Sequence, residues 1–409
     1  QAFGRLCQSL AGDPSRRLKV VAITGTNGKT TTSYLAASVL SAAGFQPGIV
    51  GTLGYADGVE VARAPWTTPP APVLATWLAR MLANGCTHAV LEASSHGLAQ
   101  SRLAGVELDV GCVTNVRHDH LDYHGTLDQY RAAKARLLDH LLPEAIAIVN
   151  ADDEVAAGYL AHFDGPVLSV GIDAAAEVAA TLVEQHISEQ TFLLTVGSQT
   201  VPVRTTLIGR HNVYNCLVAA AVGLAYGIDL ATVVRGLETI TTIPGRLERL
   251  ECGQPFGVFV DYAHTADALA GCLATLRGVT SGRLICVFGA GGDRDPSKRP
   301  LMGRAVSGAA DVAVITNDNP RSEPPREIVA GILSGFEHPS AARVILDRAE
   351  AIGWALAQAR AGDCVLIAGK GHEREQLVGD ERIACDDRQL ARERLYSSSP
   401  VSELDRASA

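Results

Sequence analysis

The chain has 409 residues, 47% of them apolar and 5% aromatic. At roughly 100–200 residues per domain this length predicts two or three domains, large enough to bury a core without disulfide or metal staples. The formal net charge of −9 disfavours a general nucleic-acid-binding surface. No apolar run reaches the ~20 residues of a membrane-spanning helix, and no signal peptide opens the chain. We therefore expect a cytoplasmic protein without a membrane span.

The cysteine pattern agrees with a reducing compartment. The nine cysteines are odd in number and irregularly spaced, and no CxxC pair occurs. Neither a disulfide framework nor a zinc ribbon is therefore expected. Several cysteines lie in strand-like apolar runs, where they are expected to serve as small buried hydrophobes.

Strands and helices alternate in the first part of the chain. Strands are expected at residues 18–23, 89–92, 110–114 and 146–150, and helices fall between them, for example at 73–83 and 127–142. This alternation predicts a parallel sheet. Residues 178–208 alternate β-branched and polar side chains instead, so we expect an antiparallel insertion or edge there, followed by a helix at 209–227.

A second domain is predicted after the linker Ile243-Pro244-Gly245-Arg246. The strand and helix alternation restarts there, with strands expected at 258–261, 284–289, 312–316, 344–346 and 365–368. The predicted plan is one domain over 18–242, a second over 243–395, and a polar tail over 396–409.

A glycine turn joins the first strand to a helix. Residues Gly25 to Thr30 read GTNGKT, and the helical stretch begins with Thr31. Glycines let backbone N–H groups approach phosphate oxygens, the helix N-terminus favours an anion, Lys29 adds a charge, and the Thr30 hydroxyl could hold Mg²⁺. The spacing is shorter than the usual GxxxxGK[ST] because position 23 is Ile. A nucleoside triphosphate site is favoured over a plain tight turn.

Two further strand ends carry polar groups. Glu92 ends a predicted buried strand, where a carboxylate could hold Mg²⁺ or could cap the next helix. Residues 118–124 hold three His and two Asp within seven positions. One imidazole on Mg²⁺ is tolerable, so His120 is a candidate ligand, with a structural turn or a zinc site as alternatives. Lys134, on a predicted helix, is a surface lysine on the bare sequence.

The ordered motifs together resemble the Mur ligases of peptidoglycan synthesis. They run from about residue 16 to 390 in the family's order and read TGTNGKTTT, LEASSHGL, TNVRHDHLDYHGT, YRAAKARLL, GRHNVYN, IPGRLE, DYAHTADAL, GAGGDRDPSKRP, TNDNPRSEPP and AGKGHE. The SSHGL and DHLDYHGT forms resemble the ligases that add the third residue of the stem peptide. Folylpolyglutamate synthase shares the architecture but not this set.

The resemblance implies a fold and a domain plan. The implied class is α/β, with a central P-loop ATPase-like domain of mostly parallel sheet and a small antiparallel part, followed by a Rossmann-like C-terminal domain. An N-terminal UDP-binding domain is also implied. Because the chain opens with Gln1, we expect it to be a processed or cut piece in which residues 1–17 are the remnant of that domain.

The resemblance also assigns the nucleotide and metal positions. ATP is implied to bind Gly25, Thr26, Asn27, Gly28, Lys29, Thr30, Thr31, Asn215, Arg246 and Asp261. Two Mg²⁺ ions are implied, one held by Thr30 and the phosphates and the other by Glu92 and His120. The catalytic set is Lys29, Glu92, His120 and Lys134, and Lys134 is implied to be carbamylated so that it supplies anionic oxygens to the second Mg²⁺. Lys29 would neutralise phosphate charge.

Two substrate sites follow from the same resemblance. The muramoyl dipeptide, UDP-N-acetylmuramoyl-L-alanyl-D-glutamate, is implied to bind Thr67, Thr68, Ser95, Gln100 and Arg102. meso-Diaminopimelate is implied to bind Arg294, Asp318, Asn319, Arg321, Gly369 and Glu373. Arg321 would pair with the distal carboxylate, since guanidinium matches a carboxylate as a planar fork, and Glu373 would face the distal ammonium. Taken alone, Asn319-Pro320-Arg321 could be a turn with an exposed arginine.

The implied activity is ATP-dependent amide formation through an acyl phosphate, by a monomer. Two departures from the family pattern occur, Trp66 before the Thr pair and Ala266 where proline is usual; Trp66 leaves one substrate contact open. Two alternatives stand beside the ligase: a nucleotide-binding scaffold without turnover, and a ligase for a different muramoyl acceptor.

Overall fold

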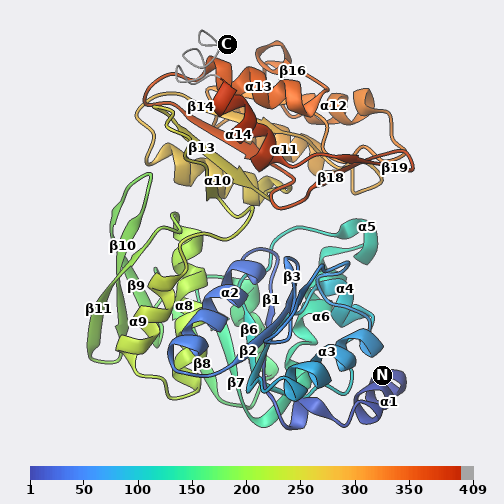
Figure 1. Cartoon of the computed structure of the whole chain (residues 1–409), viewed down its shortest axis with the longest axis vertical. Helices are drawn as coiled ribbons and strands as arrows, with labels where there is room; N and C mark the ends of the chain where they lie inside the picture. The colour runs from blue at the N-terminus through green and yellow to red at the C-terminus, as the bar shows by residue number, and fades with distance from the viewer. Residues whose placement is uncertain (398–409) are drawn as a thin grey trace, which may run out of the picture. The chain divides into compact units, whose positions relative to one another are not determined.

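The computed structural model describes residues 1–397, which form two compact units (Figure 1). The first comprises Gln1–Glu184 and Glu189–Thr241, and the second comprises Gln185–Ser188 and the chain from Thr242 onward. Of the predicted tail at 396–409, the first two residues belong to the last helix, and the remainder lies outside the described residues.

A sheet of eleven strands organises the first unit, in the order β11-β10-β9-β8-β7-β6-β1-β5-β2-β3-β4. The neighbouring strands β2, β5, β1, β6, β7, β8 and β9 run parallel to one another. Beyond β2, β3 and β4 continue the sheet as antiparallel strands, and at the other edge β10 and β11 form an antiparallel pair. The bounds are β1 Lys19–Thr24, β2 Pro47–Gly51, β3 Gly54–Ala56, β4 Val61–Ala62, β5 His88–Glu92, β6 Leu108–Val113, β7 Leu141–Asn150, β8 Val167–Gly171, β9 Val178–Gln185, β10 Gln190–Val196 and β11 Gln199–Thr205.

Helices cover both faces of this sheet (Figure 1). Their bounds are α1 Ala2–Leu10, α2 Lys29–Ala42, α3 Ala71–Ala83, α4 Ser95–Ala99, α5 Leu121–His124, α6 Leu127–Ala135, α7 Glu154–Gly158, α8 Arg210–Ala225 and α9 Leu230–Thr239. Short 3-10 turns lie at Pro14–Arg16, Leu138–His140 and Tyr159–His162.

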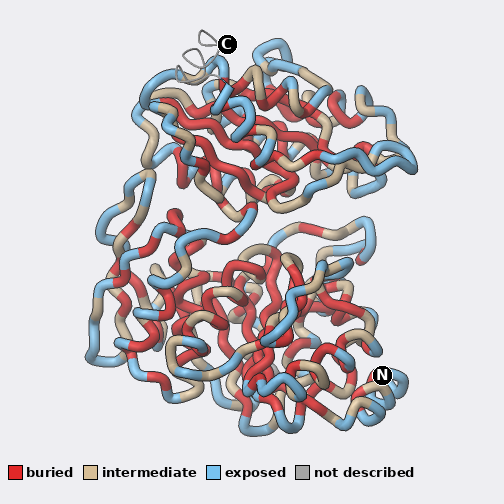
Figure 2. Tube along the Cα trace, viewed as in Figure 1, coloured by how far each residue is buried: buried red, intermediate tan, exposed pale blue. Residues whose placement is uncertain are grey.

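The central strand β1 is buried on both faces, because alternate side chains meet different helices. Val20 and Ala22 belong to the core that includes Leu78 of α3 and Tyr130 of α6. Period-two alternation then turns the side chain of Ile23 to the opposite face. Figure 2 shows the same pattern, with buried strands inside and exposed loops outside. The carboxyl end of β1 is thereby held rigidly where the glycine turn begins.

The helix predicted over 127–142 is wrong in its second half. Helix α6 ends at Ala135, and β7 begins at Leu141. Pro143 explains the difference, since a proline disfavours the helical conformation of the residue before it and cannot donate to a helix ladder. Leu141 pairs instead with Leu108 of β6.

The second unit has a six-stranded sheet in the order β12-β13-β17-β14-β15-β16, parallel except for β12. A separate hairpin is formed by β18 and β19. The bounds are β12 Glu248–Arg249, β13 Gly257–Asp261, β14 Leu284–Phe288, β15 Val312–Ile315, β16 Arg343–Val344, β17 Cys364–Ala368, β18 Glu375–Val378 and β19 Glu381–Ala384. Helices are α10 Ala266–Arg277, α11 Lys298–Ser307, α12 Pro325–Leu333, α13 Arg348–Gln358 and α14 Asp387–Ser397, with a 3-10 turn at Pro339–Ala341.

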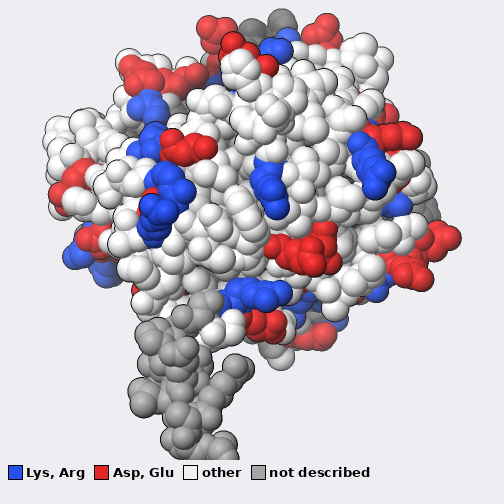
Figure 3. Space-filling model, turned by 90° about the horizontal axis from the view of Figure 1, so that it is seen from above, with Lys and Arg blue, Asp and Glu red and all other residues white. Residues whose placement is uncertain are grey.

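These two sheets confirm the predicted α/β class, with a large, mostly parallel sheet and smaller antiparallel parts. Among the helices of residues 1–397, none combines the length and the apolar character needed to cross a bilayer. On the face drawn in Figure 3, acidic and basic side chains lie interspersed among uncharged ones.

Candidate functional site

The glycine turn between β1 and α2 is packed so closely that two of its glycines have no room for a side chain. A Cβ on Gly25 would lie 1.9 Å from Thr114 Oγ1, and one on Gly28 would lie 2.3 Å from Asn215 Oδ1. Gly28 also has φ of +88° and stands immediately before α2. The first-turn N–H groups of a helix have no partner within the helix. A side-chain-free loop before such a turn fits a phosphate group.

The end of β6 holds this loop in shape. The Thr26 N–H donates to the Asn115 carbonyl (2.8 Å), and the Asn27 N–H donates to Asn115 Oδ1 (2.9 Å). The Asn115 amide donates in return to the Asn27 carbonyl (3.1 Å). Sequence reasoning missed Asn115 as a support, although it opens the segment that contains the His and Asp residues. Asn215 braces the other side from α8, where its Oδ1 accepts from the Thr32 hydroxyl (3.2 Å).

Two lysines donate to one carbonyl oxygen of the loop. The Gly25 carbonyl accepts from Lys29 Nζ at 2.8 Å and from Lys134 Nζ at 2.7 Å. Lys134 is 1% exposed, and its ammonium nitrogen lies 4.8 Å from the centre of the Tyr130 ring. Burial, and then the charge of Lys29, hold the pKa of Lys134 well below its usual range. The surface position read from the bare sequence is therefore wrong.

The carboxylate of Glu92 is fixed by three donors. The hydroxyl groups of Thr30 and Thr52 each donate to Oε2 at 2.9 Å, and the Thr52 N–H donates to Oε1 at 2.8 Å. Glu92 does not cap the following helix, because the Ser94 hydroxyl accepts from the N–H of Gly97 there. Sequence reasoning gave no signal for Thr52, which follows the end of β2. The contact between Thr30 and Glu92 joins two of the predicted metal ligands.

His120 stands at the start of α5 with φ of +54°. Its ring centre lies 4.9 Å from that of His96 and 6.3 Å from that of Tyr130, and its Nε2 lies 3.5 Å from Asp119 Oδ2. Within residues 1–397, no group of three or more His, Cys, Asp or Glu side chains is arranged to hold a metal ion.

The donor chemistry of the predicted magnesium site can be tested on these residues. A Thr hydroxyl and a Glu carboxylate are the hard oxygen donors that Mg²⁺ takes. A lysine ammonium cannot be a ligand, but an amine that is neutral through burial can accept a carboxyl group and then supplies oxygens. By donor chemistry, Thr30, Glu92 and a carbamate of Lys134 suit Mg²⁺, and one imidazole from His120 is tolerable. Thr31, in the first turn of α2, is buried.

The residues predicted for the muramoyl dipeptide lie beside Glu92. The Thr67 hydroxyl lies 3.0 Å from that of Thr52, and the Thr68 hydroxyl donates to the Glu92 carbonyl (2.6 Å). Arg102 donates to the Thr68 carbonyl and to Gln100 Oε1.

Ser95 is the remaining residue predicted for the dipeptide. Its side chain is 2% exposed, and its Oγ has no hydrogen-bond partner among the described residues. A buried hydroxyl without a partner is costly, so its orientation fits a polar ligand. Trp66, the departure from the family pattern, is half-exposed, and its carbonyl accepts from the Tyr55 hydroxyl.

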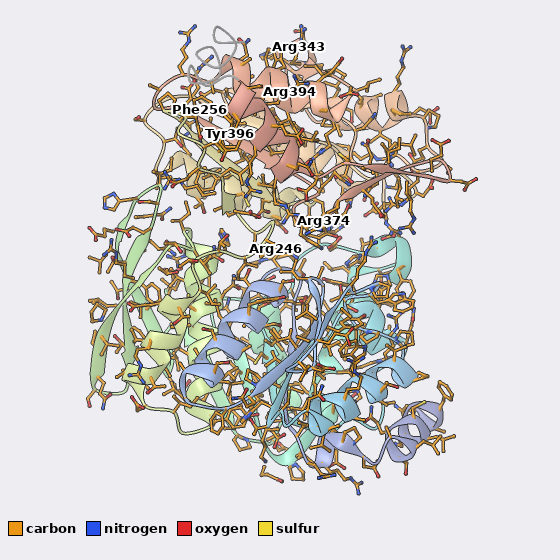
Figure 4. The ribbon with its side chains drawn as sticks, in the orientation of Figure 1. Arg246, Phe256, Arg343, Arg374, Arg394 and Tyr396 are labelled. Carbon is orange, nitrogen blue, oxygen red and sulfur yellow. The ribbon has the colours of Figure 1, made fainter. Side chains whose placement is uncertain are left out.

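Arg246 and Asp261 belong to the second unit. The Arg246 guanidinium lies 4.6 Å from the centre of the Tyr262 ring. Both oxygens of Asp261 accept backbone N–H groups, from Leu247 and Ala263. Within this unit, Arg246 and Arg374 lie toward one edge in Figure 4, away from Arg343 at the start of β16. Their role at a nucleotide stays a prediction.

The residues predicted for diaminopimelate follow the carboxyl ends of β14, β15 and β17. The Asn319 amide donates to Glu373 Oε2 at 3.0 Å. Arg321 has φ of +53° and donates through Nη1 to the Gly292 carbonyl (2.7 Å). It is therefore held in place rather than displayed on an open turn.

Two more features belong to this cluster. Asp318 is 8% exposed, and its Oδ2 has no partner among the described residues; a Cβ on Gly369 would lie 2.5 Å from it. A Cβ on Gly291 would lie 3.1 Å from Arg321 Nη1 and 3.6 Å from Arg294 Cγ, so both arginines flank that glycine. The cluster thus combines two arginines with the carboxylates of Asp318 and Glu373. Such a combination of opposite charges fits a zwitterionic ligand.

Two family descriptions match the chain. Residues 23–223 match the Mur ligase middle domain, and residues 245–371 match the Mur ligase glutamate ligase domain. Among curated proteins, a UDP-N-acetylmuramoyl-L-alanyl-D-glutamate–2,6-diaminopimelate ligase of Geobacillus thermodenitrificans is 42% identical over 400 residues, which is 96% of this chain and 82% of the relative. The enzyme of that name from Solibacter usitatus is 42% identical over 395 residues, covering 96% of this chain and 80% of the relative.

Solved structures agree. A structure of a ligase with the same printed name aligns with a TM-score of 0.66 at 36% identity, covering 96% of this chain and 81% of the other. A folylpolyglutamate synthase of Mycobacterium tuberculosis, complexed with ADP and AMPPCP, shares the fold with a TM-score of 0.70 at 21% identity over 89% of this chain and 91% of that one. With the phosphate-fitting loop, the fixed Glu92 carboxylate and the matched domains, this chain belongs to the Mur ligase family.

Proposed function

We propose that this protein is the ATP-dependent amide ligase that joins meso-diaminopimelate to the D-glutamate of UDP-N-acetylmuramoyl-L-alanyl-D-glutamate, in the synthesis of peptidoglycan precursors. The assignment of diaminopimelate as substrate rests on the cluster of residues that follows the ends of β15 and β17. Arg321 there is fixed beside Asn319, which is bonded to the Glu373 carboxylate. An anchored cation and a carboxylate in one cluster suit the distal ammonium and carboxylate of diaminopimelate.

The first unit supports the phosphoryl-transfer half of the reaction. The loop from Gly25 to Thr30 would hold the phosphates, and Lys29 would neutralise charge that otherwise repels the D-glutamate carboxylate. That carboxylate attacks the γ-phosphate, ADP leaves, and the resulting acyl phosphate is open to attack by the amine. The amine displaces phosphate, loses a proton, and an amide remains.

We propose that two Mg²⁺ ions bind here, one held by Thr30 and the phosphates and the other by Glu92, His120 and a carbamate on Lys134. When bound, Mg²⁺ supplies neutralisation of phosphate charge. The chain's own part is to hold those donors, and three hydrogen bonds from Thr30 and Thr52 fix the Glu92 carboxylate. The dipeptide would be held by Thr67, Thr68, Ser95, Gln100 and Arg102. Arg102 would supply the cation for a substrate carboxylate.

The cytoplasmic location and the monomeric state of the protein stay predictions.

The test is phosphate release by the purified protein with each substrate omitted in turn. We expect release only when ATP, the UDP-linked dipeptide and diaminopimelate are all present. Release that is equal without diaminopimelate would contradict amide formation, and no release under any condition would favour a nucleotide-binding scaffold. A panel of muramoyl dipeptides with and without the UDP group identifies a different acceptor.

Arg321→Ala tests the assignment of the amino acid. Losing a charge-assisted pair with a carboxylate should raise KM for diaminopimelate by about tenfold or more and leave KM for ATP within about twofold. Arg326→Ala, an exposed arginine on α12, is the control and should change neither constant. Equal increases in both KM values for Arg321→Ala would contradict its role.

A further inference from the structure

A fully buried lysine lies behind the diaminopimelate cluster. Lys370 follows the end of β17, and its side chain is 0% exposed. Its ammonium donates to Asn319 Oδ1 at 3.1 Å, to Glu373 Oε2 at 3.0 Å and to the Glu375 carbonyl at 2.7 Å. An ammonium has three donors, so all three are used within the protein. A buried cation is retained only where its partners compensate for lost water.

The partners of Lys370 are residues assigned above to the ligand. Asn319 Nδ2 donates to the Glu373 Oε2 that also accepts from Lys370, which closes a ring of three polar groups. Asn319 Oδ1 additionally accepts from the N–H of Leu377 on β18, so the ring is tied to the β18–β19 hairpin. The geometry leaves Asn319 and Glu373 little rotational freedom.

The second oxygen of Glu373 stands apart from this ring. Both side-chain donors reach Oε2, and within the described part of the chain no residue donates to Oε1. The Glu373 side chain is 32% exposed, whereas Lys370 is not exposed at all. Lys370 therefore acts from behind the carboxylate and cannot itself reach a ligand through solvent.

We propose that Lys370 is a positioning residue for the amino-acid site, fixing Glu373 and Asn319 for the distal end of the incoming amino acid and favouring a zwitterionic end over a lone ammonium. The proposal rests on the function proposed above. The ammonium of Lys370 largely neutralises Glu373, so a ligand that offers only an ammonium gains little net attraction. A ligand that offers an ammonium and a carboxylate contacts Glu373 and Arg321 together.

Lys370→Met tests this, since Met keeps the unbranched stem and removes the charge. With the UDP-linked dipeptide and ATP saturating, KM for diaminopimelate should rise about tenfold, while KM for ATP changes by less than about twofold. The ratio of kcat/KM for diaminopimelate over L-lysine should fall. Arg382→Met is the matched control, because Arg382 pairs with Glu375 (3.0 Å) on the same hairpin without contacting Asn319 or Glu373. It should change none of these constants.

A double variant separates positioning from a merely structural role. If Lys370 acts through Glu373, the Lys370→Met change should add much less to KM for diaminopimelate in a Glu373→Gln background than in wild type. Independent, multiplying effects, or equal rises in KM for ATP and diaminopimelate, would overturn the proposal. Lys370→Arg, which keeps the buried charge, serves if the Met variant does not fold: it should raise KM for diaminopimelate alone, and an unchanged value overturns the proposal.

These outcomes distinguish the role proposed for Lys370 from the proposed ligase function on which it rests. If wild type releases no phosphate in response to diaminopimelate, the proposed function fails, and the assignment of Lys370 fails with it. If wild type is active and Lys370→Met keeps its KM for diaminopimelate and its preference over L-lysine, only the role of Lys370 is overturned.

Discussion

Lys134 is the residue whose surroundings depart most from what its type suggests. It is enclosed between the Gly25 carbonyl and the Tyr130 ring, with Lys29 sharing the same acceptor. Two cations at one oxygen repel each other, and burial removes the water that would screen them. The side chain therefore favours the neutral amine, which is the form that can react with carbon dioxide to give an anionic carbamate.

Lys134→Ala should lower kcat by about 100-fold or more, because the proposed carbamate and its anionic oxygens cannot form. Short carboxylic acids such as acetate should restore part of the activity by supplying a carboxylate in the vacated space. Lys134→Met, which fills that space, should not be rescued. Phosphate release measured against acetate concentration gives the result, and rescue of both variants to the same extent would contradict a carbamate.

At the scale of elements, helix α2 has a glycine at each end with almost the same backbone and different surroundings. Gly28 has φ of +88° and Gly44 has φ of +85°. A Cβ on Gly28 would strike Asn215, whereas one on Gly44 would meet nothing within 4 Å. At position 44, glycine is thus needed only because of the backbone angle. At position 28, it is needed because of the backbone angle and because the loop packs closely against α8.

Substitution by alanine at the two ends should separate these requirements. Gly44→Ala should lower the free energy of unfolding by about 1–2 kcal/mol through the left-handed angle alone and leave KM for ATP unchanged. Gly28→Ala should lose on the order of 100-fold in kcat/KM for ATP, since the loop must shift. Urea denaturation and steady-state kinetics check both. Equal kinetic effects of the two changes would contradict a phosphate role for the loop.

At the scale of the whole molecule, each unit has its own sheet and its own core. The core of the second unit contains a buried ion pair, Arg348 with Asp387, in which the side chains are 1% and 0% exposed. Arg348 also donates to the carbonyls of Asn317 and Ala368, at the ends of β15 and β17. This pair joins α13, α14 and the strand ends that carry the amino-acid cluster.

Arg348→Met should destabilise the second unit by about 3–5 kcal/mol, because Asp387 is left buried without its cation. The first unit shares none of these contacts, so calorimetry should show one transition shifted to lower temperature and another unchanged. Arg343→Met is the control, since Arg343 is exposed and contacts the Trp354 ring at 5.6 Å; it should cost no more than about 1 kcal/mol. A joint shift of both transitions for Arg348→Met would show that the units unfold together.

Local sequence patterns predicted the central parallel strands of both sheets and the glycine turn, and the motifs predicted the family. Buried parallel strands are continuous apolar runs, and the turn residues at Gly25 and Gly28 are adjacent in the chain, so local patterns contain both. The order of the motifs also predicts the site residues, from Lys29 to Glu373, and their roles stay predictions. Local patterns were wrong for the second half of the helix expected over 127–142, where Pro143 follows, and for the surface position expected for Lys134.

The polar groups that support the site from distant parts of the chain become evident only in the folded structure. Thr52, Asn115 and Lys370 lie far along the chain from the residues that they hold, Glu92, Asn27 and Asn319. Their roles depend on which strand ends meet in the sheet, and no local periodicity encodes that. Lys134 shows the same limit, because its burial and its lowered pKa arise from a loop more than a hundred positions earlier in the chain. Chemistry at this site is set by burial and by pairing, and both are properties of the folded chain.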